Sequence, residues 1–434
     1  MPQELIHINT KKAVIRILLI LILIVAGAWS YYAIRWYLGN TLAEYLNPSE
    51  ANAQVADLAA SLAPGDPTTH WRVAQVTQKR LPLDQQAQAI AEYEKAVSLS
   101  PADYRFWMEL GTAQEQAGDT VRAEQALKRA ITLAPHYAYP RWYLGNLFIR
   151  EGRYDEAFAE LRLAAAANEE FLPQLFSLVW AIYSSDPDAL KNAVGESATT
   201  RARFSLYLLE QQHFDEGMRV WNSLSPDEKR SNRETAEAVI ASLKNAVRFH
   251  EAANTWNELM GDKYRAEVGR IFDGSFEEAV NHGPDSVFGW QVKGALQMSV
   301  GIDPNKGKSG SRSLRFIFQV RTDLPGLDVS QLVLVQPNTD YEFQCFVATE
   351  KLESGSSPQV QLFDMSNGAI LASSEMAPSG DNDWKPIDLS FKTGGQTEAI
   401  AVRIVRISCS SEEMPVCPIY GSVWYDDFTL KRRN

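Results

Sequence analysis

The sequence predicts a helical solenoid followed by an all-β sandwich, with one membrane-spanning helix in front of both. Three observations indicate this: an apolar stretch near the N-terminus, a 34-residue period in the first half of the chain, and a two-residue period after Asp273. Residues up to about 270 are rich in Ala, Leu, Glu, Gln and Arg, and the remainder in Ser, Gly, Val, Phe and Asp. These compositions favour helices and strands respectively.

The uncharged segment Ile17 to Ile34 is long enough to span a bilayer. Its eighteen residues rise by about 27 Å as a helix, close to the roughly 30 Å hydrocarbon layer. Lys11, Lys12 and Arg16 precede it, so the positive-inside rule predicts that the N-terminus is cytoplasmic and the rest is exported. We therefore expect a single-pass protein of the inner (cytoplasmic) membrane with most of the chain periplasmic. Its first segments are the cytoplasmic residues 1–16, the transmembrane helix 17–36 and a helical linker 38–65.

Aromatic residues gather at the outer end of this segment, where amphipathic rings favour the headgroup layer: Trp29, Tyr31, Tyr32, Trp36 and Tyr37. An alternative stays open, because Ala26-Gly27-Ala28 has the small-residue pattern of a signal-peptidase site. Cleavage there would release a soluble chain.

Residues recur at intervals of 34 in the next segment, as in Pro101 and Pro135, or Leu110-Gly111 and Leu144-Gly145. Such a period is typical of stacked helix-turn-helix units. One unit carries a bulky aromatic, a Leu-Gly pair, small residues and a terminal proline at Trp107, Leu110, Gly111, Ala123, Leu127, Ala130 and Pro135. This pattern resembles the tetratricopeptide repeat. We expect the solenoid to cover 66–265, with the repeat degenerate at 169–203.

The resemblance implies that the first helix of each unit lines a concave, protein-binding face. By register, this face comprises Arg105, Met108, Thr112, Tyr139, Trp142 and Asn146. A clamp for C-terminal carboxylates is not implied, because Met108 and Trp142 stand where that clamp needs Lys and Asn. We expect a protein or peptide partner; alternatively, the aromatic residues pack against a neighbouring domain.

After Asp273, alternating segments bounded by Gly, Pro, Asn or Asp predict a two-sheet antiparallel sandwich over 268–434. The expected strands are 313–320, 331–336, 341–350, 358–364, 388–393, 399–407 and 422–430. The landmarks DGSFEE near 273, GW at 289–290, DW at 383–384 and WYDDFTL from 424 resemble the jelly-roll carbohydrate-binding modules of bacterial cellulases and xylanases.

The resemblance implies polysaccharide binding and a structural calcium ion. Glu277, with Asp426 or Asp427, would supply hard oxygen ligands, although these acids are alternatively only solvated. Stacking on sugar rings needs an exposed aromatic residue. Trp290 and Trp384 occupy landmark positions and are expected in the core, whereas alternation places Trp424 on the opposite face from Val423 and Tyr425. Trp424 is therefore the candidate carbohydrate-binding residue.

Cys409 and Cys417 flank a short polar stretch, which predicts a disulfide in an oxidising compartment. Cys345 is in phase with Tyr341, Phe343 and Val347 and is expected to be buried.

The remaining patterns argue against several function classes. The net charge of −12 disfavours nucleic-acid binding. The six histidines have no metal-ligand spacing, and no catalytic motif is evident. We expect a non-catalytic, membrane-anchored scaffold for assembly or export of an envelope or extracellular polysaccharide. The alternatives are an accessory subunit of a glycan-active enzyme and a purely structural protein-interaction module.

Overall fold

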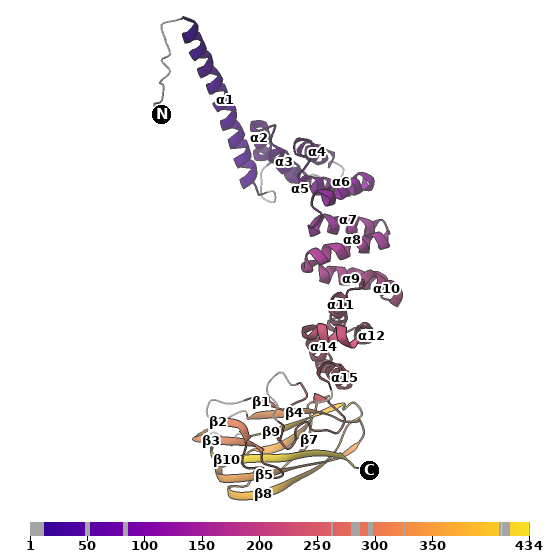
Figure 1. Cartoon of the computed structure of the whole chain (residues 1–434), viewed down its shortest axis with the longest axis vertical. Helices are drawn as coiled ribbons and strands as arrows, with labels where there is room; N and C mark the ends of the chain where they lie inside the picture. Colours follow the sequence, from indigo (N-terminus) through magenta and orange to yellow (C-terminus); the bar gives the residue numbers. More distant parts are fainter. Residues whose placement is uncertain are drawn as a thin grey trace, which may run out of the picture. The chain divides into compact units, whose positions relative to one another are not determined.

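The computed structural model describes residues 13–47, 53–80, 86–261, 264–278, 287–293, 298–323, 327–407, 409 and 417–433. The chain divides into two compact units, Met1–Glu196 and Ser197–Asn434. Within the described ranges, fifteen α-helices precede ten strands (Figure 1). The predicted order of a helical part followed by an antiparallel β part is therefore confirmed.

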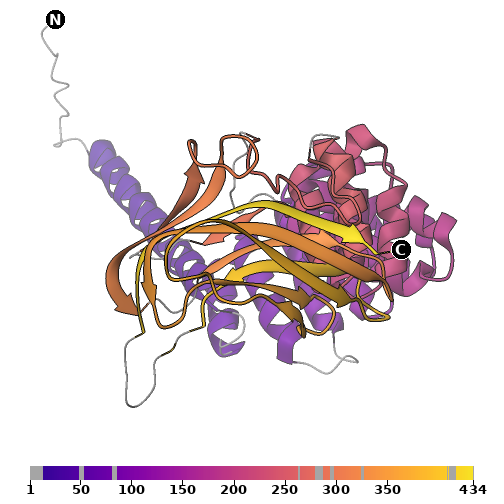
Figure 2. The same ribbon diagram turned by 90° about the horizontal axis from the view of Figure 1, so that it is seen from below.

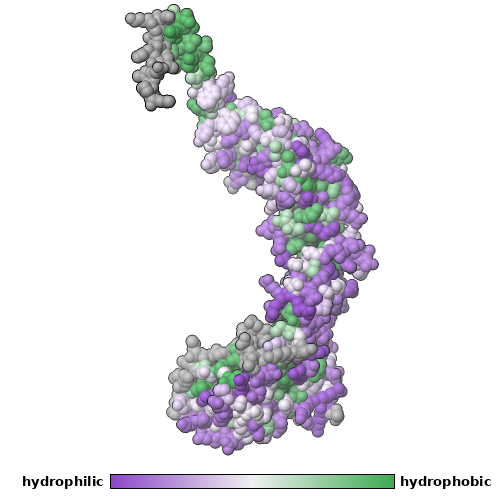
Figure 3. Space-filling model, viewed as in Figure 1, coloured by the Kyte–Doolittle hydropathy of each residue, from purple (hydrophilic) through white to green (hydrophobic). Residues whose placement is uncertain are grey.

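The apolar N-terminal segment lies in α1 (Ala13–Tyr45), a helix of 33 residues. By length and composition it could cross a membrane, and none of its most apolar window is buried. In Figure 3 the upper part of this helix is green, hence hydrophobic, and its lower end is pale to purple. The sequence predicts a transmembrane helix over 17–36 and a helical linker over 38–65, but α1 continues without a break to Tyr45. Lys11 and Lys12, on which the predicted orientation rests, lie outside the described residues.

The first unit continues as a series of antiparallel helix pairs. Its further helices are α2 (Ala53–Leu62), α3 (Pro67–Arg80), α4 (Ala87–Leu99), α5 (Tyr104–Gln116), α6 (Thr120–Leu133), α7 (Ala138–Arg150), α8 (Tyr154–Ala167), α9 (Leu172–Tyr183) and α10 (Pro187–Val194). The helices α5, α7 and α9 begin at residues 104, 138 and 172, which are 34 apart. The repeat therefore keeps its register into 169–203. The later loss of spacing arises at α10, which has eight residues where α6 and α8 have fourteen.

Glycine lets the two helices of a pair approach closely. A Cβ added at Gly111 would lie 2.8 Å from Leu127 Cγ, and one added at Gly145 would lie 2.6 Å from Leu161 Cγ. Both separations are shorter than van der Waals contact, so a larger residue would force the helices apart. The Leu-Gly pairs of the sequence therefore mark where the paired helices touch.

The second unit contains helices and both sheets. Its helices are α11 (Ala198–Glu210), α12 (Phe214–Asn222), α13 (Pro226–Ser231), α14 (Arg233–Asn245) and α15 (Phe249–Met260). Its strands are β1 (Gln291–Lys293), β2 (Met298–Asp303), β3 (Ser313–Asp323), β4 (Asp328–Leu334), β5 (Asp340–Ser354), β6 (Gln359–Asp364), β7 (Ile370–Ser373), β8 (Gly380–Lys392), β9 (Ala399–Val405) and β10 (Pro418–Arg432).

The strands form two five-stranded antiparallel sheets, ordered β1-β4-β9-β6-β7 and β2-β3-β10-β5-β8. Figure 2 shows their long, curved strands from below. One hydrophobic core joins residues of both sheets, among them Val360 and Val402 from one sheet and Phe316 and Cys345 from the other. Cys345 is fully buried there, as its phase in the sequence predicts.

The last helices of the second unit share a hydrophobic core with the sheets. Trp256 of α15 clusters with Phe288, Leu334 and Ala399, and its indole nitrogen donates to the Tyr264 carbonyl at 2.9 Å. The Glu398 carboxylate accepts a hydrogen bond from the backbone of α15 at 3.0 Å. The sequence predicts a domain boundary at 265–268, whereas the compact units divide between residues 196 and 197.

We predict that a fragment of residues 197–434 is more stable than one of 268–434. The shorter fragment exposes Phe288 and Leu334, and burial of each such side chain is worth about 1.5–3 kcal/mol. Urea denaturation followed by far-ultraviolet circular dichroism should show a free energy of unfolding at least about 3 kcal/mol lower for the shorter fragment. Trp256→Ala in the longer fragment should lower its stability in the same direction. Equal midpoints for the two fragments would contradict the shared core.

Candidate functional site

A groove between the first helices of two successive pairs is the candidate protein-binding site of the first unit. We call it the α5–α7 groove; its volume is about 620 Å³ and its lining is Thr112, Glu115, Gln116, Thr120, Trp142, Tyr143, Asn146, Leu147, Arg150 and Glu151. Three of the six residues predicted for the concave face, Thr112, Trp142 and Asn146, lie in it.

The helical period places these side chains together. Thr112, Glu115 and Gln116 follow one another at i, i+3 and i+4 along α5, and residues so spaced share a helix face. Asn146 and Arg150 stand four residues apart on α7. The 34-residue offset between α5 and α7 then sets the two faces side by side.

Trp142 is held in place by an aromatic cluster. Its ring stacks on Phe171 with centroids 4.4 Å apart and an interplanar angle of 14°. Tyr139, which is 49% exposed, contacts the same ring edge-to-face at 5.3 Å. Phe171 lies in a short 3₁₀ turn, Glu169–Phe171. The aromatic residues of the predicted face therefore pack on a residue of their own unit.

Two predicted residues have other surroundings. Arg105 pairs with Asp103 at 2.6 Å, at the start of α5. Met108 packs against the cluster that contains Leu144 and Phe148. Neither lines the α5–α7 groove.

The charged end of the groove was not predicted from the sequence. Arg150 of α7 forms an ion pair with Glu115 of α5, and the Gln116 side chain accepts a hydrogen bond from Gln78 at 2.8 Å. The signal was present, because Glu115 and Gln116 continue the face of Thr112 by one turn, and Arg150 continues that of Asn146. The predicted register ended one turn too early.

The groove offers groups suited to recognition. Asn146 donates to the Trp142 carbonyl at 2.8 Å, and its amide oxygen accepts no hydrogen bond from the described residues. An amide both donates and accepts, which matches the alternating groups of a peptide backbone. Beside it lie an indole ring and a guanidinium group, which are frequent anchors of protein interfaces.

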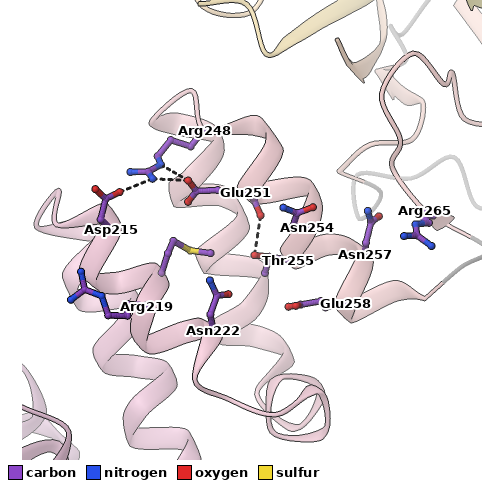
Figure 4. A pocket seen from close by; sticks show the side chains of 11 residues that line it. Asp215, Arg219, Asn222, Arg248, Glu251, Asn254, Thr255, Asn257, Glu258 and Arg265 are labelled. Carbon is purple, nitrogen blue, oxygen red and sulfur yellow. Dashed lines mark hydrogen bonds and ion pairs between the residues drawn. The ribbon is translucent and has the colours of Figure 1, made fainter. Parts of the chain in front are cut away.

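A second groove, the α12–α15 groove, lies in the second unit and has a volume of about 750 Å³. Figure 4 shows that α12 contributes Asp215, Arg219 and Asn222 to its lining and that α15 contributes Glu251, Asn254, Thr255, Asn257 and Glu258. None of these residues was singled out from the sequence, although each set recurs at three- and four-residue spacing.

Ion pairs occupy most charges of this groove. Arg248 bridges Asp215 at 2.7 Å and Glu251 at 2.6 Å (Figure 4), and Glu258 pairs with Lys229 at 2.8 Å. The side chains of Arg219, Asn222 and Asn254 make no hydrogen bond or ion pair with described residues. Arg248 neutralises both Asp215 and Glu251. These two carboxylates are therefore not free to act as a pair, and the groove presents mainly polar hydrogen-bonding groups.

The three carboxylates predicted to bind calcium all contact the segment 308–312. Glu277 accepts hydrogen bonds from the backbone of Ser311 at 2.8 Å and of Arg312 at 2.7 Å. Asp426 is fully buried and accepts one from the backbone of Lys308 at 2.6 Å. Asp427 accepts one from the Ser309 hydroxyl.

The contacts described for these carboxylates are hydrogen bonds, and they leave the calcium prediction untested. The carboxylate oxygens receive N–H and O–H donors, whereas calcium needs six to eight oxygen ligands around one point. Among the residues that the structure describes, no group of three acidic, His or Cys side chains could hold a metal ion. Calcium binding by Glu277, Asp426 and Asp427 stays a prediction.

The expectation that Trp424 is exposed for sugar stacking is wrong. Trp424 does face away from the core residues Val423 and Tyr425, but it is only 2% exposed. Lys306 lies over its ring at 3.4 Å from the centroid, and its indole nitrogen donates to Asp303 at 2.8 Å. Alternation predicted the face correctly and could not predict this polar cover. Of the two expected core tryptophans, Trp290 is 1% exposed and Trp384 is only partly buried.

Cys409 and Cys417 form a disulfide with a Cα–Cα distance of 5.0 Å. Arg406 donates to the Cys417 carbonyl and approaches its sulfur at 3.1 Å. The residues between them, 410–416, lie outside the described ranges.

Comparisons with known proteins bear mainly on the first unit. The family model of the tetratricopeptide repeat matches residues 115–179. Superkiller complex protein 3 of Mus musculus is 27% identical over 148 residues, which are 30% of this chain and 9% of that protein. The Homo sapiens protein of the same name is 28% identical over 98 residues, 23% of this chain and 6% of that protein. The chain thus spans less than a tenth of the length of these curated relatives.

Two kinds of solved structure show weak similarity. A crystal structure of MamA is 17% identical and covers 34% of this chain and 84% of its own, with a TM-score of 0.28. The structure of TmCBM61 in complex with β-1,4-galactotriose is also 17% identical, and covers 38% of this chain and all of its own, with a TM-score of 0.28. Both TM-scores are low, so nothing about this chain follows from either.

The buried Asp426 predicts a pH dependence of the second unit. Burial raises the pKa of its carboxyl from 3.8 to about 6. The folded state therefore binds more protons than the unfolded state between these values, and the stability from this group is complete below about pH 4 and is lost as the pH rises to about 6. A shift of about two units corresponds to about 3 kcal/mol.

The measurement is the free energy of unfolding of the fragment 197–434 between pH 4 and pH 7. Asp426→Asn should remove the decline of about 3 kcal/mol. Asp383→Asn, which alters an exposed aspartate of β8, should retain it. A decline that persists in Asp426→Asn would assign the effect to another group.

Proposed function

We propose that this protein is a non-catalytic, membrane-anchored scaffold whose helix pairs bind a protein partner. The observation that carries the proposal is the α5–α7 groove. Its α7 side, with Trp142, Asn146 and Arg150, lies within the residues 115–179 that match the tetratricopeptide repeat. Such repeats serve as protein-interaction scaffolds, because stacked pairs build extended binding surfaces.

The chemistry of the groove favours an extended peptide segment. Asn146 and Thr112 can hydrogen-bond to the partner's backbone, and Trp142 can contact an apolar or aromatic side chain. Arg150 can bind a carboxylate of the partner if its ion pair with Glu115 opens. This set differs from the Lys and Asn clamp for C-terminal carboxylates, so we propose an internal segment of the partner as the ligand.

The proposed location is the inner (cytoplasmic) membrane, with the N-terminus inside and the chain after the membrane helix in the periplasm. Support comes from α1, which is apolar and unburied over its central window, and from the disulfide, which suits an oxidising compartment. Cleavage after Ala28, which would release a soluble chain, is the alternative.

The proposed process is assembly or export of an envelope or extracellular polysaccharide, with a jelly-roll sandwich that contacts the glycan. This part has the least support, because Trp424 is buried. The alternatives are an accessory subunit of a glycan-active enzyme and a module that binds protein alone. The test is calorimetric titration of the fragment 197–434 with the producing cell's own polysaccharide. Binding is expected for the proposed scaffold and for an accessory subunit, and no binding is expected for a module that binds protein alone.

We predict that a photoreactive amino acid at Thr112 or Asn146 crosslinks one common partner in cells. The same amino acid at Val121, which is 68% exposed on α6 but outside the groove, should not. Trp142→Ala should weaken the purified complex by roughly thirtyfold, about 2 kcal/mol, as is typical when a buried interface tryptophan is removed. Trp142→Ala also removes the stack on Phe171 and could therefore disturb folding. Asn146→Ala keeps this stack, so a loss of affinity in that variant reports on the groove alone. Different partners at the two positions, or full affinity in both variants, would contradict the groove.

Membrane anchoring is tested by two charges in α1. Ile20→Arg with Ile24→Arg should move the chain from the membrane to the soluble fraction, because each buried charge costs about 2.5–3.5 kcal/mol at the helix centre. The matched double variant with alanine should stay in the membrane. External protease should cut the wild-type chain beyond residue 40 in spheroplasts. A soluble wild-type chain beginning near Trp29 would instead establish the cleaved signal peptide.

A further inference from the structure

The same six residues, RWYLGN, occur twice in this chain, at 35–40 and at 141–146. The second copy lies in α7, the first helix of the α7–α8 pair. The first copy lies in the last three turns of α1, directly after the apolar segment. A sequence that forms the first helix of a pair is therefore built into the proposed membrane helix.

The glycines of the two copies have the same role. A Cβ at Gly145 would lie 2.6 Å from Leu161 Cγ and 3.1 Å from the Ala157 carbonyl oxygen of α8. A Cβ at Gly39 would lie 2.7 Å from Ala63 Cβ, just beyond α2, and 2.8 Å from the Ala59 carbonyl oxygen of α2. Both glycines thus lie where their helix touches its partner helix too closely for any side chain.

Polar contacts fix the end of α1 in the same arrangement. Arg35 donates to the Ser61 carbonyl at the end of α2 at 2.9 Å, as Arg141 contacts Glu160 of α8 at 2.6 Å. Asn40 donates to Asp66 at 2.7 Å, and Arg72 of α3 donates to the Ala43 carbonyl at 3.0 Å. Residues 35–45 and α2 therefore form a helix pair on which α3 packs.

One face of this pair differs from its counterpart. Leu144 is 1% exposed, because it packs on Ala123 and Leu127 of the preceding pair. The equivalent Leu38 is 47% exposed, and no described helix pair precedes it. Its neighbours Trp36 and Tyr37 are 51% and 64% exposed.

We infer that α1 is both the membrane helix and the first helix of the repeat array, and that lipid covers Trp36, Tyr37 and Leu38, which are exposed on successive sides of α1. The inference rests on the proposed membrane anchor. Eighteen residues from Ile17 to Ile34 fill about 27 Å of the bilayer, so residues 35–45 begin at its interface. Tryptophan and tyrosine favour this layer, and an arginine there is close to lipid phosphates. These three residues follow Arg35 at the end of the apolar segment in the same helix, which favours lipid over a second copy as the cover.

The bilayer thereby takes the place of a capping unit. Terminal repeats of a solenoid need an outer face compatible with their surroundings, and here those surroundings are headgroups and upper acyl chains. No flexible linker separates membrane and array, because α1 runs unbroken through both. A partner in the α5–α7 groove is then held at a fixed height above the membrane.

The helix pair is tested by Gly39→Leu in the full chain, reconstituted in vesicles of phosphatidylcholine and phosphatidylglycerol. The matched control is Gly27→Leu, because a Cβ at Gly27 meets nothing within 4 Å. Hydrogen exchange of residues 53–62 should accelerate at least about tenfold in Gly39→Leu, since the pair cannot close. Gly27→Leu should match the wild type. Unchanged exchange in Gly39→Leu would overturn the pairing of α1 with α2.

The lipid cover is tested by a fluorophore on Leu38→Cys, with Val121→Cys as the water-exposed control. Labelling is specific, because Cys345 is buried and the other two cysteines are paired. A nitroxide carried by lipid should quench the label at 38 several-fold more than that at 121, and soluble iodide should do the reverse. Equal quenching at both positions in vesicle-bound protein would overturn the inference while leaving the anchor. If the label at position 38 is shielded from both quenchers, a protein and not lipid covers this position. If the protein does not bind vesicles, the membrane anchor itself is wrong.

Discussion

The close approach of the two helices within each pair determines most of the helical structure. Among the described glycines inside helices, four mark this approach, Gly39, Gly111, Gly145 and Gly217, where an added Cβ would lie 3.0 Å or less from a side-chain carbon of the neighbouring chain segment. At these glycines the backbone of one helix lies against its neighbour. Successive first helices then present equivalent faces, and a groove forms between them. The contact recurs in both compact units, so one packing rule applies from α1 to the helices that precede the sheets.

The sequence predicted the pairs well because three of these contacts, at Gly39, Gly111 and Gly145, are marked by a Leu-Gly dipeptide, with small residues in the second helix. It predicted α1 less well. Hydropathy falls after Trp36, which suggested that the helix ends there. The backbone hydrogen bonds of α1 nevertheless continue to Tyr45, because the segment from Ala13 to Tyr45 contains no residue that ends the helix. The shortening of α10 was also not foreseen. It arises from Gly195, whose φ of +94° ends the helix early, and from Arg162, whose guanidinium contacts its last carbonyls.

The candidate sites show where periodicity stops being informative. Half of the predicted concave face lies in the α5–α7 groove, because helical register fixes direction over a few turns. Arg105 and Met108 do not, since an ion pair with Asp103 and a neighbouring hydrophobic cluster engage them. Strand alternation gave Trp424 the correct face of β10. Its burial depends on Lys306 and Arg315, which lie over the ring and come from chain more than a hundred residues away. Such long-range cover leaves no local pattern.

The shared core of α15 and the sheets has a consequence for how this architecture is inherited. A domain that recombines freely must keep a solvated surface at its boundary, yet here Trp256, Phe288, Leu334 and Ala399 form one dry cluster. Exchanging the sandwich for another would leave the tryptophan without its partners. The segment that could be exchanged between proteins as one piece therefore begins at Ser197. Substitutions in the helices before residue 265 and in the sheets after it must remain compatible, because both sides build the same core.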